Sequence, residues 1–190
     1  CKMCPEPVRK VVFTLYGSFS KTYHGHGTDR ALLGGILGFH TDDARIRDAF
    51  EWAEKMGVEY EFVIDEETKT DHPNTADMDI TGVNGYRLSV RGESIGGGKI
   101  KIVRINGIDV EFTGEYSTLI VRQIDKPGVV AHITQCLSKE EVNIAFMRLF
   151  REDKGATAFT VVESDEQIPE EILAEIQKNE HVQDLMLVQM

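Results

Sequence analysis

A glycine-rich stretch between residues 16 and 35 carries the side chains best suited to bind a small anion. It contains Lys21, His26, Thr28 and Asp29, between a strand-like apolar run and a helix-like run. Glycine lets a backbone approach a ligand closely, and free N–H groups at a helix start attract anions. The stretch therefore predicts a substrate or small-anion site. The alternative is a structural turn in which Asp29 caps the helix and the histidines are solvated.

Two further polar patches compete with this stretch. The first of these is His72-Pro-Asn74, since histidine as a residue type can titrate near neutral pH and asparagine both donates and accepts hydrogen bonds, although an Asx turn would explain the same residues. Segment 96–99 has three glycines followed by Lys99, which could meet a carboxylate. A kinked or bulged strand is the alternative interpretation there.

The sequence offers no complete catalytic constellation: it has no H-E-x-x-H, no dinucleotide fingerprint and no Ser-His-Asp spacing signature. Cys1 and Cys4 form a single C-x-x-C, too few ligands for structural zinc or a four-cysteine cluster. We therefore expect no catalytic residue and no metal in this chain. A small metal-dependent hydrolase using His24, His26 and His72 is an alternative that elemental analysis would test.

Composition narrows the class of protein. A net charge of −11 argues against a nucleic-acid surface, which needs a basic stripe. No apolar run approaches the ~20 residues of a membrane span, and no signal peptide opens the chain. Three cysteines do not make a secreted disulfide framework. We expect a cytoplasmic protein, and the start at Cys1 suggests a fragment of something longer.

The elements that must position these side chains form two groups. In the first, hairpin turns are predicted at 84–85 and 106–107. Its expected helices cover 29–37 and 41–56, and its expected strands cover 8–15, 58–64, 77–81, 86–94, 100–105 and 108–112. This pattern predicts a mixed α/β domain with a mostly antiparallel sheet, over residues 1–114.

The second group reads strand, helix, strand, strand, helix, strand. The expected ranges are 116–123, 129–139, 142–151, 156–163, 169–179 and 182–189. This order matches the ferredoxin-like βαββαβ unit, over residues 115–190. Cys136 is expected to pack in its core. The whole chain is therefore predicted to belong to the α+β class.

Motifs in the first group strongly resemble the β subunit of iron–sulfur-dependent bacterial L-serine dehydratase, and they occur in the family's order. They are Tyr16-Gly-Ser-Phe, Thr22-Tyr, Gly25-His-Gly-Thr-Asp, Gly34-Gly, His72-Pro-Asn-Thr and Ser94-Ile-Gly-Gly-Gly-Lys99. The match covers about residues 8 to 112. Residues 117 to 190 resemble an ACT domain: Asp125-Lys-Pro-Gly128 is similar to its effector loop, and Asn143-Ile144 to its second strand.

The resemblance implies a pyridoxal-independent conversion of L-serine to pyruvate and ammonia. In the family, a [4Fe-4S] cluster with an open iron site binds serine and polarises its hydroxyl group as a Lewis acid. The cluster cysteines belong to an α subunit. A Ser-Ser-Ser-His-Thr motif near the start of the β subunit adds active-site groups and is not present here. We therefore expect this chain to hold no cofactor, to need a cluster-bearing partner, and to be inactive alone.

The first domain also resembles the allosteric-substrate-binding fold, which is a regulatory part of some phosphoglycerate dehydrogenases. That likeness implies that His72 and Asn74 grip L-serine or a related small acid. The loop from Lys21 to Asp29, together with Lys99, would complete that pocket or face the α subunit's active site.

ACT domains pair across sheet edges or helices and bind amino acids at the interface. The resemblance therefore implies a homodimer through the ACT domain or the first domain. It also implies an effector site at Asp125, Gly128 and Asn143. The alternative function is a non-enzymatic amino-acid sensor.

Overall fold

The computed structural model describes residues 3–151 and 153–189, so Cys1 lies outside the described residues. The chain divides into two compact units, with the division between Gly107 and Ile108. No helix among these described residues is both long and apolar enough to cross a membrane.

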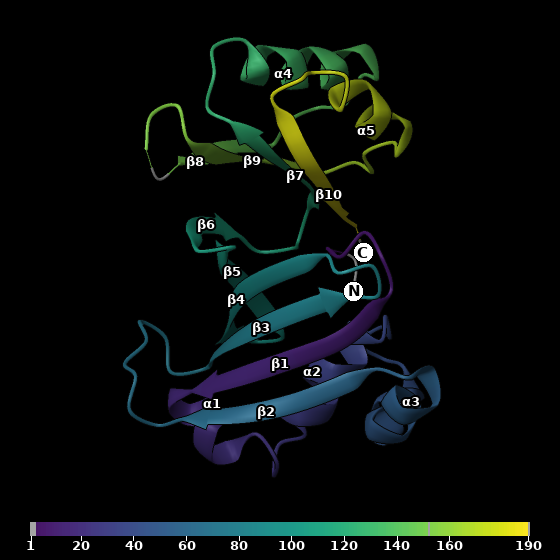
Figure 1. The fold of residues 1–190 in the computed structure, drawn as a ribbon, viewed down its shortest axis with the longest axis vertical. Helices are drawn as coiled ribbons and strands as arrows, with labels where there is room; N and C mark the ends of the chain where they lie inside the picture. The colour runs from purple at the N-terminus through teal and green to yellow at the C-terminus, as the bar shows by residue number, and fades with distance from the viewer. Residues whose placement is uncertain (1–2, 152, 190) are drawn as a thin grey trace. The chain divides into compact units, whose positions relative to one another are not determined.

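The first unit is built on a mixed sheet in which the strands of this unit have the order β2-β1-β3-β4-β5 (Figure 1). β1 runs parallel to β2, and the pairs β1–β3, β3–β4 and β4–β5 are antiparallel. The strands of this unit are β1 (Val8–Tyr16), β2 (Glu59–Asp65), β3 (Thr75–Gly82), β4 (Arg87–Gly96) and β5 (Lys99–Ile105), and β6 (Ile108–Phe112) follows the division between the units. The predicted mixed α/β fold with a mostly antiparallel sheet is confirmed.

The helices of this unit lie on one face of the sheet (Figure 1). They are α1 (Gly17–Thr22), α2 (Thr28–Ile36) and α3 (Ala49–Met56), preceded by a 3₁₀ turn, η1 (Ala44–Asp48). The single helix expected over 41–56 is therefore wrong in its first turns. The Asp43 carboxylate accepts a hydrogen bond from the Arg45 backbone N–H at 2.9 Å, and this local bond starts the 3₁₀ turn instead.

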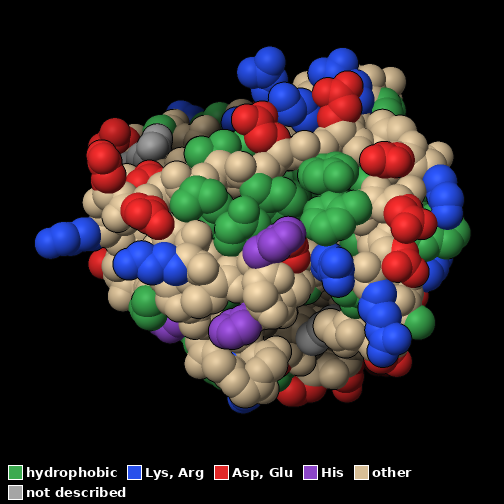
Figure 2. Space-filling model, turned by 90° about the horizontal axis from the view of Figure 1, so that it is seen from below, with side chains coloured by type: hydrophobic (Ala, Val, Ile, Leu, Met, Phe, Trp, Pro, Cys, Tyr) green, Lys and Arg blue, Asp and Glu red, His purple; other side chains and the backbone are tan. Residues whose placement is uncertain are grey.

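Alternating side chains of β1 explain why this face is covered. Val11, Phe13 and Leu15 are fully buried on it, as is Leu33 of α2. Where β2 meets the helices, the Phe62 ring stacks on Phe13, with centroids 4.8 Å apart. Figure 2, seen from below, shows apolar side chains gathered on the surface of the molecule with a histidine beside them. Burial of these alternate side chains fixes the strand register.

The second unit has the predicted βαββαβ order, which is confirmed. Its sheet order is β10-β7-β9-β8, and all its pairs are antiparallel. The elements are β7 (Ser117–Ile124), α4 (Val129–Lys139), β8 (Phe146–Arg151), β9 (Thr157–Ser164), α5 (Glu171–Ile176) and β10 (Val182–Val188).

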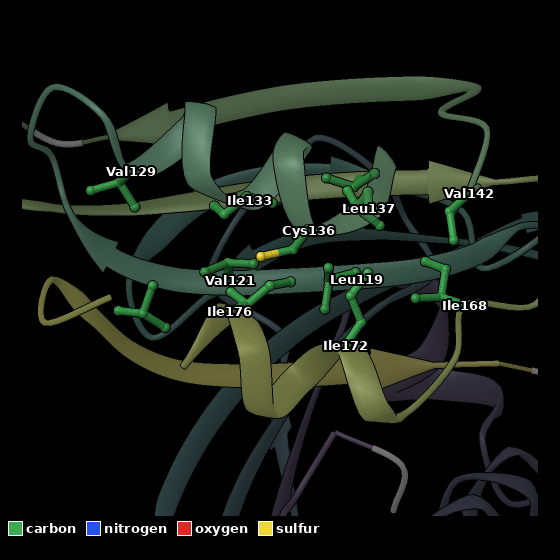
Figure 3. Packing of buried hydrophobic residues seen from close by; sticks show 12 residues of the cluster. Leu119, Val121, Val129, Ile133, Cys136, Leu137, Val142, Ile168, Ile172 and Ile176 are labelled. Carbon is green, nitrogen blue, oxygen red and sulfur yellow. The ribbon is translucent and has the colours of Figure 1, made fainter. Parts of the chain in front are cut away.

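The core of the second unit lies between its sheet and its two helices. Figure 3 shows Ile133 of α4 and Ile176 of α5 pointing toward Val121 of β7. Cys136 lies in the same cluster and is 5% exposed, as expected for a core residue. Apolar residues at helical spacing thus bury one stripe of each helix against the sheet.

Candidate functional site

The glycine-rich stretch folds as α1, a short loop and α2, and α1 was not predicted from the sequence. The backbone N–H of Ser18, in the first turn of α1, donates to the carbonyl oxygen of Pro73 at 2.6 Å. Gly17 has φ +55°, and a Cβ atom there would lie 2.5 Å from the same oxygen. A glycine at position 17 therefore allows two motifs that are distant in the sequence to meet.

The His72-Pro-Asn74 segment forms a turn held by its own side chains. The Asn74 N–H lies 3.1 Å from His72 Nδ1. Because a backbone N–H can only donate, Nδ1 must accept, and the neutral ring then carries its proton on Nε2. The His72 carbonyl oxygen accepts from the hydroxyl groups of Thr70 and Thr75 at 2.7 and 2.6 Å. The side chain that makes the local turn bond is thus His72, not Asn74.

The same turn is attached to β4. The Ser94 N–H donates to the Asn74 carbonyl oxygen at 2.9 Å, and Asn74 Nδ2 lies 3.5 Å from the Ser94 carbonyl oxygen. The half-buried turn therefore holds an imidazole N–H donor and an amide oxygen acceptor at fixed positions. Such a pair suits the carboxylate and ammonium groups of an amino acid.

A cavity of about 470 Å³ lies between the helices and strands β3 to β5. Two predicted site residues, His26 and Thr28, line it together with Ser94. The rest of its wall is formed by Phe19, Gly27, Ala31, Leu32, Gly35, Ile36, Ala76, Met78, Gly92, Glu93, Ile100 and Ile102. The structure thus brings the glycine-rich loop onto the same cavity as the segment before the three glycines.

Asp29 does not line this cavity. It is 2% exposed, its Oδ2 lies 2.6 Å from His24 Nδ1, and its Oδ1 accepts from the Arg30 N–H at 2.8 Å. The N-cap of α2 is Gly27, without a side-chain cap. Asp29 therefore holds His24 of the loop and the Arg30 N–H of α2, but it is not the helix N-cap.

The two predicted lysines lie outside the cavity lining. Lys21 is exposed in the last turn of α1. Lys99 is exposed at the start of β5, where it pairs with Gly96 across the β4–β5 hairpin. The register shift between Ser94 and Gly96 agrees with the kinked-strand interpretation of this glycine segment.

Sequence reasoning missed a polar cluster on β1, β3 and β4. Arg91 donates through Nε and Nη2 to the two Asp77 oxygens at 2.6 and 2.7 Å, and the Tyr16 hydroxyl donates to Asp77 at 2.8 Å. Burial, together with Asp77, raises the pKa of Tyr16. Hydrogen bonds to Asp77 raise the pKa of Arg91. Only the strand register could have revealed this cluster.

In the ACT unit, the predicted effector residues separate into two places. Asp125 Oδ2 accepts from Gly155 N–H at 3.1 Å and from Arg151 Nη1 at 2.8 Å, and these bonds lower the Asp125 pKa. Gly128, with φ +92°, precedes α4. Asn143 follows α4 and lines a separate cavity of about 380 Å³. Because the eleven residues of α4 span roughly 16 Å, one chain alone does not join these residues into one site.

The described residues do not fit an iron–sulfur cluster. Cys4 and Cys136 are buried free cysteines, and they lie in different units. A cluster of this type is held by thiolates converging on one centre. Across residues 3–151 and 153–189, no three His, Cys, Asp or Glu side chains are grouped to hold a metal ion.

The second unit has the βαββαβ order, and residues 117–181 within it match the ACT domain family. Residues 2–103, more than half of the chain, match the family described as serine dehydratase beta chain. The chain belongs to the serine dehydratase beta chain family.

Curated relatives agree with this assignment. The chain is 40% identical over 173 residues to the probable L-serine dehydratase, beta chain, of Bacillus subtilis (strain 168), covering 91% of this chain and 77% of that protein. It is 41% identical over 167 residues to the L-serine dehydratase, beta chain, of Peptoniphilus asaccharolyticus, covering 88% and 75%. It is 25% identical over 172 residues to D-3-phosphoglycerate dehydrogenase of Bacillus subtilis (strain 168), covering 90% and 32%.

Proposed function

We propose that this chain is the regulatory and structural β part of an iron–sulfur-dependent L-serine dehydratase, which converts L-serine to pyruvate and ammonia. The observation that carries the proposal is its identity of 40% to a relative named as a beta chain, over 91% of its length. In the proposed complex, a [4Fe-4S] cluster on an α subunit supplies the Lewis acid for the leaving hydroxyl group. This chain supplies binding groups and does not turn over serine alone.

The turn at residues 72–74 is the proposed serine site of the first unit. The His72 Nε2–H would donate to the carboxylate of serine, and Asn74 would accept from its ammonium group. The bond from Asn74 N–H to His72 Nδ1, at 3.1 Å, supports this role because it holds the ring in the donating tautomer. Lys21 and Lys99 would face the partner subunit, since both are exposed and outside the cavity lining.

For the ACT unit we propose pairing of two chains. β8 lies at the edge of its sheet and exposes Phe146 and Leu149, at 43% and 44%. Antiparallel pairing of two β8 strands would cover both side chains. It would also bring the Asp125–Gly128 loop of one chain toward Asn143 of the other, so that the effector site needs two copies.

Reconstitution tests the proposed activity. A cluster-bearing α subunit combined with this chain should produce pyruvate from L-serine. The same α subunit without this chain should be inactive. Equal turnover without this chain would contradict the proposal. No turnover in either case, with L-serine still bound by this chain, would favour the alternative of an amino-acid sensor.

Calorimetry on the chain alone tests the serine site. L-serine should bind and D-serine should bind more weakly. The donor of His72 and the acceptor of Asn74 have fixed positions, so they match the carboxylate and ammonium groups of one enantiomer. His72→Ala and Asn74→Ala should each weaken L-serine binding about tenfold, the equivalent of one good hydrogen bond. Binding that is undiminished in both variants would refute the site assignment.

A further inference from the structure

We propose that the cavity beside α2 binds a small aliphatic monocarboxylate, at a site separate from the serine site. The cavity measures about 470 Å³, which is within the usual range of small-ligand pockets. Neither His72 nor Asn74 lines it. The proposal therefore goes beyond the proposed function and does not depend on a partner subunit.

The apolar walls of the cavity favour a ligand with an aliphatic chain. Leu32 and Ile36 of α2 line it together with Met78 of β3 and Ile102 of β5. Ile100 also lines the cavity and is 49% exposed, so a bound aliphatic group would cover it. A hydroxymethyl group that lies against these apolar side chains would lose its water without gaining a hydrogen-bond partner from them. An aliphatic chain instead gains from each apolar area that it covers.

Polar side chains at the same cavity determine which polar group the ligand should carry. Within the described part of the chain, the side chains of His26, Thr28 and Ser94 have no hydrogen-bond partner. Two hydroxyl groups and an imidazole can all donate to one acceptor. Three donors at one cavity match a carboxylate, which accepts through both of its oxygens.

The nearby acidic side chains already have partners. Asp29 Oδ2 is paired with His24 Nδ1 at 2.6 Å. The carboxylate of Glu93, which belongs to the cavity lining, lies 3.6 Å from Lys101 Nζ. A ligand carboxylate would therefore meet the three donors, while Asp29 and Glu93 stay with their own partners.

Two glycines keep the cavity open and suggest how to fill it. Gly35 lies in the interior of α2, and a Cβ atom there would meet nothing within 4 Å. A leucine at this position should fill the cavity without a clash, and it is a better helix former than glycine. Gly92 offers less room, because a Cβ atom there would lie 3.5 Å from the Ile102 side chain.

The test is calorimetric titration of the purified chain with isocaproate, with isocaproamide as the neutral analogue. Isocaproate should bind, and the amide should bind more weakly because it lacks the charged acceptor. Gly35→Leu should abolish binding, while Ala131→Leu, at an exposed position of α4, should not change it. Thr28→Val keeps the side-chain shape without the hydroxyl group and should weaken isocaproate binding about tenfold.

Absence of isocaproate binding would overturn the proposal, as would undiminished binding by Gly35→Leu. Equal binding of acid and amide would overturn the carboxylate head. If Gly35→Leu does not fold, the proposal is tested with Thr28→Val and Ser94→Ala instead. Undiminished isocaproate binding in both variants would then overturn it. His72→Ala separates the two sites: it should weaken L-serine binding and leave isocaproate binding unchanged. Serine binding without isocaproate binding would sink this inference and leave the proposed function intact.

Discussion

The Nδ1 atom of His24 lies 2.6 Å from the Oδ2 atom of Asp29, and this pair closes the glycine-rich loop. The His24 side chain is 81% exposed, whereas that of Asp29 is only 3% exposed. Gly27, between them, has φ +70°, which favours glycine. The pair and this glycine together fix the path of the backbone on which His26 and Thr28 reach the cavity.

Loss of this pair should loosen the loop more than it destabilises the fold. Because the His24 ring is mostly solvated, His24→Ala should lower the free energy of unfolding by less than about 1 kcal/mol. Asp29→Ala should cost about 1–2 kcal/mol, since the Arg30 N–H in the first turn of α2 also loses its acceptor. Urea unfolding measures both. His26→Ala, in the same loop, is the control and should have the smallest effect.

Gly17 should tolerate substitution worse than Gly27. Alanine at either position adopts a left-handed backbone, at a cost of about 1–2 kcal/mol. At position 17 the added Cβ atom would also lie 2.5 Å from the Pro73 carbonyl oxygen, whereas at position 27 it would meet nothing within 4 Å. Gly17→Ala should therefore be the more destabilising variant in urea unfolding. It should also displace the turn at 72–74.

L-serine calorimetry on the same two variants checks the second effect. Gly17→Ala should weaken binding, and Gly27→Ala should leave it near the unsubstituted value. Equal losses of stability in both variants would show that the contact with Pro73 does not constrain the turn.

Stability should depend on pH through Glu163, which is 4% exposed. Burial raises the pKa of Glu163, only partly offset by Arg148. A carboxyl group whose pKa is raised by folding holds its proton more tightly in the folded state. The contribution of Glu163 to the free energy of unfolding is therefore complete below the ordinary glutamate pKa. It is lost as the pH rises through the raised pKa of the folded state.

Glu163→Gln should remove this pH dependence and be more stable than the unsubstituted chain at neutral pH. Urea unfolding from pH 4 to pH 7, about the range in which a shifted glutamate titrates, measures the effect. Glu140→Gln, at an exposed position, should keep the pH dependence. A profile for Glu163→Gln that parallels the unsubstituted chain would contradict the assignment.

The bidentate contact of Arg91 with Asp77 should not survive replacement by lysine. Lysine offers one ammonium group and lacks the planar fork that meets both carboxylate oxygens. Because both side chains are about 20% exposed, at 22% and 20%, Arg91→Lys should cost about 1–2 kcal/mol. Arg87→Lys, exposed on the same strand, should cost less than about 0.5 kcal/mol.

A double-mutant cycle with Tyr16→Phe checks that the three residues form one network. The Tyr16 hydroxyl group and Arg91 both bind Asp77, so the losses of stability in the two single variants should not sum to the loss in the double variant. Additive losses would mean that tyrosine and arginine contribute independently. The raised pKa of Tyr16 gives a second measurement. In an absorbance titration, Tyr16→Phe should remove a tyrosine that ionises at higher pH than an ordinary tyrosine.

Much of the fold could be predicted from the sequence because its signals are local. Apolar residues alternate along β1, recur at helical spacing in α4 and α5, and are separated by glycine turns. The motifs from Tyr16 to Lys99 were also enough to indicate the family, which residues 2–103 confirm. The helix α1 was missed because Gly17, Ser18 and Ser20 carry no helical pattern of their own.

By itself, then, the sequence determined the order of the strands and of the longer helices, the families of the two parts of the chain and the polar groups available for binding. Only the tertiary structure decided which of these groups meet. Tyr16 and Asp77 are 61 positions apart and touch because strand register aligns them. His26 and Thr28 share a cavity with Ser94, while Asp29, one position from Thr28, turns to His24. The reason is physical: local propensity fixes the backbone of each element, but long-range packing and register fix which faces oppose one another.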